Sequence, residues 1–344
     1  MPVTLKDIAR EVGVSVTTAS RALAGYPDVA PTTRQRVQQV AAALGYVPNT
    51  AARNLQRQRT DTLALVLPTT ADLRFSDPFF SEFLSGLVQA TGEAGFALTV
   101  ATGSPNDETA TYLRLIRSRR ADGFVLVRTR RDDRRIALLQ EAGVPFVSFG
   151  RVNGTPGVHC VDEDDVHGIH LMVDHLAGLG HTRIACIAEP TRFVKGYHRF
   201  RGYCLGLEAH GLSFAPDLVV ETNYRQRSGY EAAQQLLAMP EPPTAIIACN
   251  DLLALGALSA IQARGLQAGH DVSVTGYDNI PLAEHAQPPL TTVDQPADKL
   301  GTLVAQMLTS LIRGDPVAEK QVILQPAAVI RQSSGPPPRA ARRR

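Results

Sequence analysis

Apolar residues in the first 45 positions recur at the three- and four-residue spacing of short helices. Leu5, Ile8, Ala9 and Val12 fall on one face of a first helix, and Gly13 permits a tight turn behind it. A second helix turns small apolar side chains inward and leaves four side chains facing outward: Val16, Thr17, Ser20 and Arg21. Two short helices around a tight turn are typical of a helix-turn-helix reader of DNA.

Cap residues agree with these helices. Thr4 precedes the first helix and Asp7 follows three residues later, which is the capping-box arrangement, and Ser15 precedes the second helix. A third helix is predicted over residues 31–44, because a proline suits its first turn and its apolar stripe runs to Leu44.

Residues 46–60 form a polar and basic segment. Asn49 can cap a helix of about two turns, but a helix that short is not stable alone in water. We therefore expect a linker that becomes helical only when a partner orders it.

From Leu63 onward, short apolar strands alternate with amphipathic helices. Strands are predicted at residues 63–67, 96–101, 124–127, 144–149, 183–188, 245–248 and 272–276, with helices at 82–93, 108–119, 170–179, 230–237 and 252–264. So many short strands over this length fit two doubly wound parallel sheets better than one. The Pro-, Ser- and Arg-rich tail at residues 332–344 is predicted to be disordered.

Charge is unevenly distributed along the 344 residues, although the net charge is only +2. Residues 1–60 carry eight positive and three negative side chains, so this segment has a net charge of +5 and the rest a net charge of −3. A basic segment attached to an acidic body is typical of a separate nucleic-acid-binding module.

Several protein classes are disfavoured. No apolar run has the length of a membrane span, and the N-terminus lacks the apolar stretch of a secretory signal, so we expect a cytoplasmic protein without a membrane partner. The four cysteines are not paired at metal-ligand spacing, which favours reduced thiols. No phosphate loop, dinucleotide fingerprint, nucleophile elbow or zinc-protease motif is present, so we expect neither an enzyme nor a cofactor.

Motifs spread in order along nearly the whole chain resemble the LacI/GalR family of bacterial repressors. In the N-terminal part they are residues 3–23 (VTLKDIAREVGVSVTTASRAL), 45–49 (GYVPN) and 52–55 (ARNL). In the body they are residues 77–80 (DPFF), 179–185 (LGHTRIA), 250–251 (ND), 276–278 (GYD) and 289–293 (PLTTV).

The resemblance implies a domain plan. A helix-turn-helix domain takes residues 1–48, a hinge helix or linker takes 49–60, and a two-lobed, periplasmic-binding-protein-like sensor and dimerisation domain takes 61–331. Lobe 1 comprises about residues 61–161 and 293–323, and lobe 2 comprises about 162–292 and 324–331.

The resemblance also implies how DNA would be bound. Val16, Thr17 and Arg21 match the residues that read base edges in the major groove. The residues expected to hold phosphates, which position the reader without specifying sequence, are Lys6, Ser15, Thr18, Ser20 and Arg34.

The family's linker forms a hinge helix in the minor groove, where a leucine wedges between two base pairs. Leu55 matches that leucine, beside Ala52 and Arg53 in the segment that Asn49 begins. The competing interpretation is a linker leucine that packs against the sensor domain.

In such a sensor, the ligand lies between the lobes at the carboxyl ends of the strands. The residues carried over to this effector site are Phe79, Arg128, Arg151, Arg199, Tyr224, Asn250 and Asp278. An aromatic platform with forked polar groups suits the vicinal hydroxyls of a sugar, with an α-glucoside as one form, while a purine is the alternative. For the charged residues, ion pairs between the lobes are the competing interpretation.

Residues 162–170 at first look like a metal site, because His167 and His170 lie one turn apart among carboxylates. Carboxylates at a helix N-terminus are favourable for dipole reasons alone, and no further ligands stand at a recognisable spacing. We therefore expect no metal.

Together these features predict a homodimeric transcriptional regulator that binds near-palindromic double-stranded operator DNA. We expect a repressor of carbohydrate uptake or catabolism genes that is controlled by a small-molecule effector. An inducer that releases the repressor is the favoured form, and a corepressor is the alternative. A purine-responsive repressor of the same architecture and a carbohydrate-active cytosolic enzyme are the alternatives.

Overall fold

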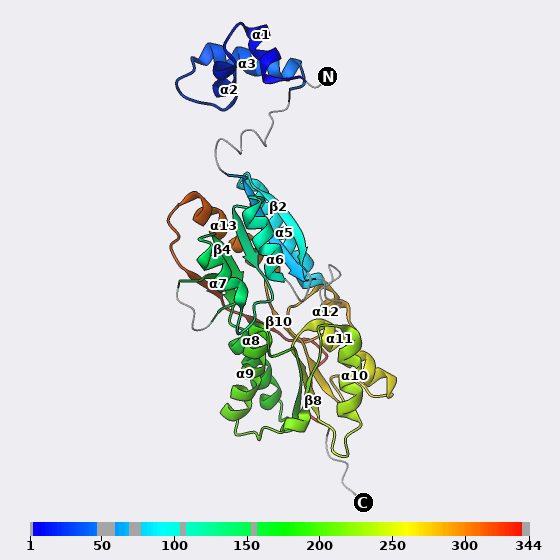
Figure 1. Cartoon of the computed structure of the whole chain (residues 1–344). Coiled ribbons are helices and arrows are strands. Elements are labelled where there is room, and N and C mark those ends of the chain that lie inside the picture. The colour runs from blue at the N-terminus through cyan, green and yellow to red at the C-terminus, as the bar shows by residue number, and fades with distance from the viewer. Residues whose placement is uncertain (1–2, 47–58, 69–76, 104–107, 153–156, 339–344) are drawn as a thin grey trace, which may run out of the picture. The chain divides into compact units, whose positions relative to one another are not determined.

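The structure is a computed structural model that describes residues 3–46, 59–68, 77–103, 108–152 and 157–338 (Figure 1). The chain folds into two compact units, Met1–Thr60 and Asp61–Arg344.

Three helices form the described part of the first unit: α1 (Leu5–Val12), α2 (Val16–Leu23) and α3 (Pro31–Ala43). Their shared core is small and is made of Ile8, Ala9, Val12, Ala19, Ala22, Val29, Val37 and Ala41. The expectation that Leu44 continues the buried stripe is wrong. Leu44 is the C-cap of α3 and its side chain is 41% exposed.

The predicted caps of the first unit are present. The backbone N–H and the hydroxyl of Thr4 both donate to the Asp7 carboxylate, at 2.9 and 2.6 Å. Gly13 adopts a left-handed φ of 75°, which turns the chain between α1 and α2. The Ser15 hydroxyl accepts from the backbone N–H of Thr18 at 3.0 Å, so it caps α2. These local bonds set the angle at which α2 leaves the turn.

Lobe 1 of the second unit is built on a six-stranded parallel sheet of order β11-β5-β4-β3-β1-β2. The strands are β1 (Thr62–Pro68), β2 (Ala97–Gly103), β3 (Gly123–Leu126), β4 (Phe146–Phe149), β5 (His159–Glu163) and β11 (Gln321–Leu324). Its helices are α5 (Pro78–Glu93), α6 (Glu108–Arg117), α7 (Arg134–Glu141) and α13 (Ala297–Arg313).

The alternation along β1 shows how helices cover both faces of this sheet. Leu63 and Leu65 pack in the core that includes α5 and α13, while Ala64 and Val66 pack in the core that includes α6 and α7. Burial on both faces is why β1 reads as a continuous apolar run.

Lobe 2 is built on a four-stranded parallel sheet of order β7-β6-β8-β9. The strands are β6 (Ile184–Ala188), β7 (Val219–Glu221), β8 (Ala245–Ala248) and β9 (Ser273–Thr275). The helices are α8 (Asp165–Gly178), α9 (Val194–Ala209), η1 (Pro216–Leu218), α10 (Gln226–Leu237), α11 (Asp251–Ala263) and α12 (Pro281–His285). Helices α8 and α9 pack on one face and α10 and α11 on the other (Figure 1). The two doubly wound parallel sheets that the sequence predicts are therefore present.

The chain crosses from lobe 1 to lobe 2 between β5 and α8 and crosses back later in the sequence. Strand β5 still belongs to the lobe 1 sheet, and α8, which begins two residues later, packs in lobe 2. Near the return crossings, β10 (Thr292–Asp294) pairs antiparallel with β12 (Ala327–Val329). The first crossing thus falls about two residues later than predicted.

The prediction of a disordered tail from residue 332 is wrong for residues 332–338, which pack on lobe 2. The Ser333 side chain is fully buried and its hydroxyl donates to the Val274 carbonyl at 2.6 Å. The Gly335 carbonyl contacts Nε2 of His181 at 2.8 Å. Composition suggested disorder, but these buried polar bonds order the segment. Residues 339–344 lie outside the described residues.

Candidate nucleic-acid interface and effector cleft

The outward face of α2 presents the side chains predicted to read bases. Val16 is 41% exposed, and Thr17 and Arg21 are also exposed, while Ala19 and Ala22 on the opposite face are buried. An apolar side chain, a hydroxyl and a guanidinium that stand on the solvent side of a short helix match the chemistry of base edges in the major groove.

Arg21 is held by two neighbours in the loop behind α2. Its Nη2 lies 2.6 Å from Oδ2 of Asp28, and its guanidinium lies over the Tyr26 ring, 5.2 Å from the ring centroid. The side chain is therefore not a freely rotating cation.

The residues predicted to hold phosphates differ in exposure and in how many hydrogen bonds they already make within the protein. Lys6 is exposed. The hydroxyls of Ser15 and Thr18 bond each other at 2.8 Å, and Ser20 is half-buried. Arg34 is the residue most committed to the fold, because its Nη2 donates to the carbonyls of Tyr26 and Val29, at 2.7 and 3.2 Å. A phosphate contact by Arg34 remains a prediction and would share the guanidinium with this loop.

The predicted hinge falls outside the described residues. Asn49, Ala52, Arg53 and Leu55 all belong to residues 47–58. Their minor-groove role stays a prediction from the resemblance.

A cavity of about 800 Å³, including its open mouth, lies between the two lobes of the sensor. Its lining residues are Asp77, Phe79, Phe80, Val127, Arg128, Thr129, Phe149, Gly150, Glu189, Phe193, Val194, Lys195, Arg199, Tyr224, Asn250 and Asp278. Six of the seven predicted effector residues are among them.

Aromatic rings from both lobes line the cavity. From lobe 1, Phe79 near the start of α5 stacks with Phe149 at the end of β4, with ring centroids 6.0 Å apart. From lobe 2, Phe193 lies at 6.3 Å from Tyr224 with the rings tilted by 54°. A flat ligand, or one with apolar faces, would meet rings from both lobes.

Polar groups gather in the same cavity where β6 and β8 end. Asn250 follows β8, and its Nδ2 donates to Oε1 of Glu189, which follows β6, at 2.8 Å. The Asn250 side-chain oxygen also accepts from the Leu253 N–H at 2.8 Å, so it caps α11. Burial raises the pKa of Glu189, and Arg199 opposes this rise. The pair offers a ligand hydroxyl both an acceptor and a fixed amide.

Arg199 lines the cavity but its guanidinium is already bonded on every side. Nε donates to Asp165 at 2.9 Å, and Nη2 donates to Asp278 and to Gln295, both at 3.1 Å. Nη1 donates to the Cys249 carbonyl. The side chain is only 3% exposed. The guanidinium of Arg199 therefore holds Asp165, Asp278 and Gln295 in place at the edge of the cavity.

The lobes contact each other beside the cavity. The Val194 N–H donates to the Thr129 carbonyl at 2.9 Å, a main-chain bond from lobe 2 to lobe 1. Arg128 has a left-handed φ of 51°. Its guanidinium lies over two rings of lobe 2, 4.2 Å from the centroid of Tyr224 and 5.1 Å from the centroid of Phe193. A lobe 1 cation thus covers lobe 2 rings in this conformation.

Arg151 does not line the cavity, which corrects its predicted place in the effector site. Its Nε donates to Asp162 at 3.0 Å and its Nη2 to Asp164 at 3.2 Å. The carboxylates at the end of β5 draw the side chain toward the crossover between the lobes, away from the ligand space.

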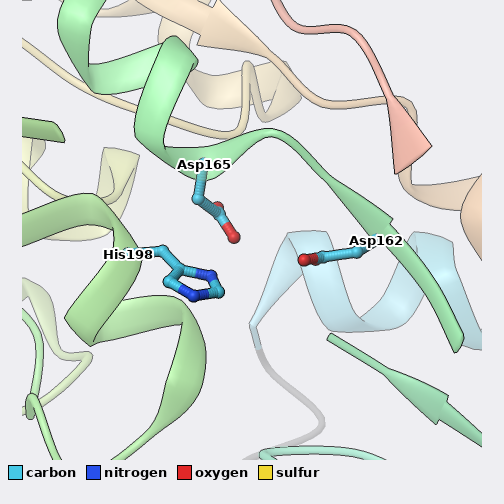
Figure 2. Close-up of side chains that lie close together, drawn as sticks. All are labelled: Asp162, Asp165 and His198. Carbon is cyan, nitrogen blue, oxygen red and sulfur yellow. The ribbon is translucent and has the colours of Figure 1, made fainter. Parts of the chain in front are cut away.

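Three side chains near that crossover resemble a metal site, and Figure 2 shows them converging: Asp162, Asp165 and His198. Their ligand atoms lie within 4.8 Å of one another. The Lys195 ammonium, however, lies 3.2 Å from Asp162 and 3.1 Å from Asp165, so a cation of the protein already serves both carboxylates. Burial would raise the pKa of Asp165, yet Lys195 and Arg199 hold it below its ordinary value. The arrangement is satisfied as an ion-pair cluster.

The two histidines singled out from the sequence do not join this group. His170 pairs instead with Asp174, one turn along α8, at 3.3 Å. Asp164 caps that helix by accepting from the N–H of His167. The acidic run therefore caps a helix, as its dipole favours.

Sequence reasoning missed several lining residues. Glu189 follows a predicted strand directly, so the rule that ligands meet the carboxyl ends of strands could have found it. Asp77 belongs to the DPFF motif and caps α5 through the Phe79 N–H at 3.1 Å. No local signal marks Phe193 or Lys195, because only the packing of the lobes brings them to the cavity.

Among the described residues, we find no helix with the length and apolarity needed to cross a bilayer.

Comparisons with known proteins agree with this geometry. Residues 4–49 match the bacterial regulatory proteins of the lacI family, and residues 173–334 match the periplasmic binding protein-like domain. The HTH-type transcriptional regulator CelR of Thermobifida fusca is 37% identical over 332 residues, which cover 96% of this chain and 98% of CelR.

Two solved structures share the architecture. A complex of the transcriptional regulator CelR with cellobiose aligns with a TM-score of 0.75 and 35% identity, over 96% of this chain and 99% of that one. A lac repressor dimer bound to operator and the anti-inducer ONPF aligns with a TM-score of 0.87 and 27% identity, over 97% and 100%. With this match along almost its full length, the chain belongs to the LacI family of bacterial regulatory proteins and is a DNA-binding transcriptional regulator.

Proposed function

We propose that this regulator binds a neutral sugar between its lobes and that the sugar controls its affinity for operator DNA. One observation carries the proposal: the inter-lobe cavity combines rings from both lobes with a fixed amide and carboxylates where the strands end. Rings cover the apolar C–H faces of a sugar, and forked polar groups bridge its hydroxyls. The related CelR structure is a complex with cellobiose, which supports this ligand class.

The regulator would bind the ligand without converting it. Each carboxylate that faces the cavity already has a structural role, because Asp77 caps α5, Glu189 bonds Asn250, and Asp278 bonds Arg199. A catalytic acid or base must be free to exchange a proton with the substrate. The described lining contains no serine, cysteine or histidine that could act as a nucleophile.

DNA binding would follow the dimeric plan of the family. Two copies would place one α2 each in successive major grooves, which requires a near-palindromic operator. Val16, Thr17 and Arg21 would read bases, and Leu55 would wedge into the minor groove between the half-sites. The lac repressor dimer on its operator, which aligns over 97% of this chain, supports this plan.

The two sites would be coupled through the lobes. A sugar that fits both lobes changes their relative position, and this change would loosen the linker at residues 49–60 and weaken operator binding. The protein would then act as a repressor of carbohydrate genes, released by its inducer.

The test measures both equilibria on the full-length protein. An operator is first selected from a pool of random duplexes, and neutral mono-, di- and trisaccharides are then screened by calorimetry beside adenine and guanine. We expect one sugar to bind and to lower operator affinity, and the operator to lower sugar affinity by the same factor. Binding of a purine alone, turnover of the sugar, or unequal coupling factors would each contradict the proposal.

A further inference from the structure

Arg21 and Asp28 form an ion pair on the exposed side of the helix-turn-helix unit. Nη2 of Arg21 lies 2.6 Å from Oδ2 of Asp28, and the two side chains are 46% and 48% exposed. Pairs this exposed add little to folding stability, because water screens them and ordering two side chains costs entropy. The short contact therefore calls for a role other than stability.

The loop that carries Asp28 is fixed at several points. The Tyr26 N–H donates to the Arg21 carbonyl at 3.1 Å, and the Val29 N–H donates to the Tyr26 carbonyl at 3.3 Å. Arg34 then donates to the carbonyls of Tyr26 and Val29 from α3. Asp28 lies between these anchored residues, so its carboxylate meets Arg21 from a defined direction.

Two contacts thereby fix the orientation of the Arg21 guanidinium. The central carbon of the guanidinium lies 5.2 Å from the centroid of the Tyr26 ring, so the ring covers one face. The Asp28 carboxylate pairs with Nη2 on one edge. A guanidinium has five donors in one plane, so the remaining edges stay available. Guanine presents O6 and N7 side by side in the major groove, which is the acceptor pair that an arginine fork recognises.

Asp28 also carries the wrong charge for binding DNA in general. It is one of only three acidic residues in a segment with a net charge of +5. A carboxylate close to phosphates weakens attraction to every duplex, whatever its sequence. A residue that lowers general affinity while it orients a base reader increases discrimination between sequences.

We propose that Asp28 is a positioning residue that orients Arg21 toward a guanine of the operator and so determines sequence specificity. The inference rests on the base-reading role proposed above for Arg21.

The experiment uses the full-length protein and the operator selected from random duplexes. Affinities for this operator and for each single base-pair substitution in it are measured for the native protein, Asp28→Ala, Asp28→Asn, Arg21→Ala and the double variant Arg21→Ala with Asp28→Ala. Glu11→Ala is the matched control, since Glu11 is an exposed acid of α1 in the same unit. Thermal unfolding checks that each variant is folded.

We expect Asp28→Ala to reduce discrimination at one guanine position by about tenfold, the size of a good bidentate contact. Asp28→Asn should reduce it less, because an uncharged oxygen still accepts a hydrogen bond. Arg21→Ala should abolish discrimination at the same base pair, and removing Asp28 in addition should change nothing there. Glu11→Ala should raise affinity for all duplexes alike and leave discrimination unchanged.

The possible failures are distinguishable. If Arg21→Ala relaxes one position while Asp28→Ala leaves every position as it was, the positioning role is wrong and base reading stands. If Asp28→Ala sharpens the preference for that guanine, Asp28 competes with the base and the inference is overturned. If the native protein shows no sequence preference, or Arg21→Ala changes none, the base-reading role fails and the inference with it.

Discussion

Nη2 of Arg199 donates to Oδ1 of Asp278 at 3.1 Å, while Nε of the same side chain donates to Asp165 at 2.9 Å. One guanidinium therefore joins the loop after β9 to the start of α8. Arg199→Gln would leave Asp278 buried without its cation and would leave Asp165 with Lys195 alone. Because an uncompensated buried charge is costly, we expect the variant to lose about 3–5 kcal/mol of unfolding free energy in urea titrations.

A matched control distinguishes the loss of a buried ion pair from the loss of a positive charge alone. Arg227 pairs with Glu231 on the exposed face of α10, with side chains 88% and 59% exposed. Arg227→Gln removes the same charge and should leave the urea midpoint unchanged. Equal effects of the two substitutions would mean that the buried network around Arg199 does not support the fold.

The Tyr224 ring provides a direct test of the cavity. Tyr224→Ala should weaken sugar binding about tenfold in calorimetry, because the sugar loses a stacking surface. Operator affinity without sugar should stay the same, since Tyr224 belongs to the sensor unit. Tyr224→Phe keeps the ring and should bind the sugar nearly as well as the native protein. If the Phe and Ala variants lost affinity equally, the hydroxyl and not the ring would be the contact.

The stability of the sensor should depend on pH through Asp251. Burial raises the pKa of this carboxyl from 3.8 to about 7, although Thr292 and the Ile280 N–H bond it at 2.6 and 2.9 Å. The folded state thus keeps a proton that the unfolded chain has released. The resulting stabilisation is complete below about pH 3.8 and is lost as the pH rises toward 7.

Asp251→Asn isolates this effect, because an amide does not titrate and can still bond both neighbours. Between pH 5 and pH 7, the unfolding free energy of the native protein should fall relative to that of the variant. The slope of this difference is at most about 1.4 kcal/mol per pH unit. A difference that stays flat across this range in urea titrations would show that Asp251 is ionised throughout.

Much of the fold could be predicted from the sequence, because the predicted strands are apolar on both faces. Residues 63–67 and 245–248, for example, read as buried strands and are found as β1 and β8. The missed strands, such as β7 and β12, have only three residues each and are partly exposed. Their backbone bonds depend on neighbouring strands that are distant in sequence, which periodicity cannot detect.

The lining of the cavity was predictable where a residue lies just beyond the end of a strand. Asn250 follows β8 and lines the cavity as expected. Arg151 also follows a strand, but Asp162 and Asp164 bond it more than ten residues away in sequence. Whether the Arg151 side chain turns toward the cavity or toward these carboxylates depends on distances in the folded protein. The sequence alone does not give those distances.

Leu55 lies outside the described residues, and its predicted role can still be tested by comparing two properties of one variant. An exposed leucine that wedges between base pairs contributes only when DNA is bound, whereas a leucine packed on the sensor contributes to the folded protein itself. We therefore expect Leu55→Ala to weaken binding to the selected operator about tenfold or more, with little change in the thermal midpoint of the free protein. Fluorescence anisotropy with labelled operator and differential scanning calorimetry give the two values. A lower midpoint together with unchanged operator affinity would place this leucine in the protein core and remove it from the minor groove.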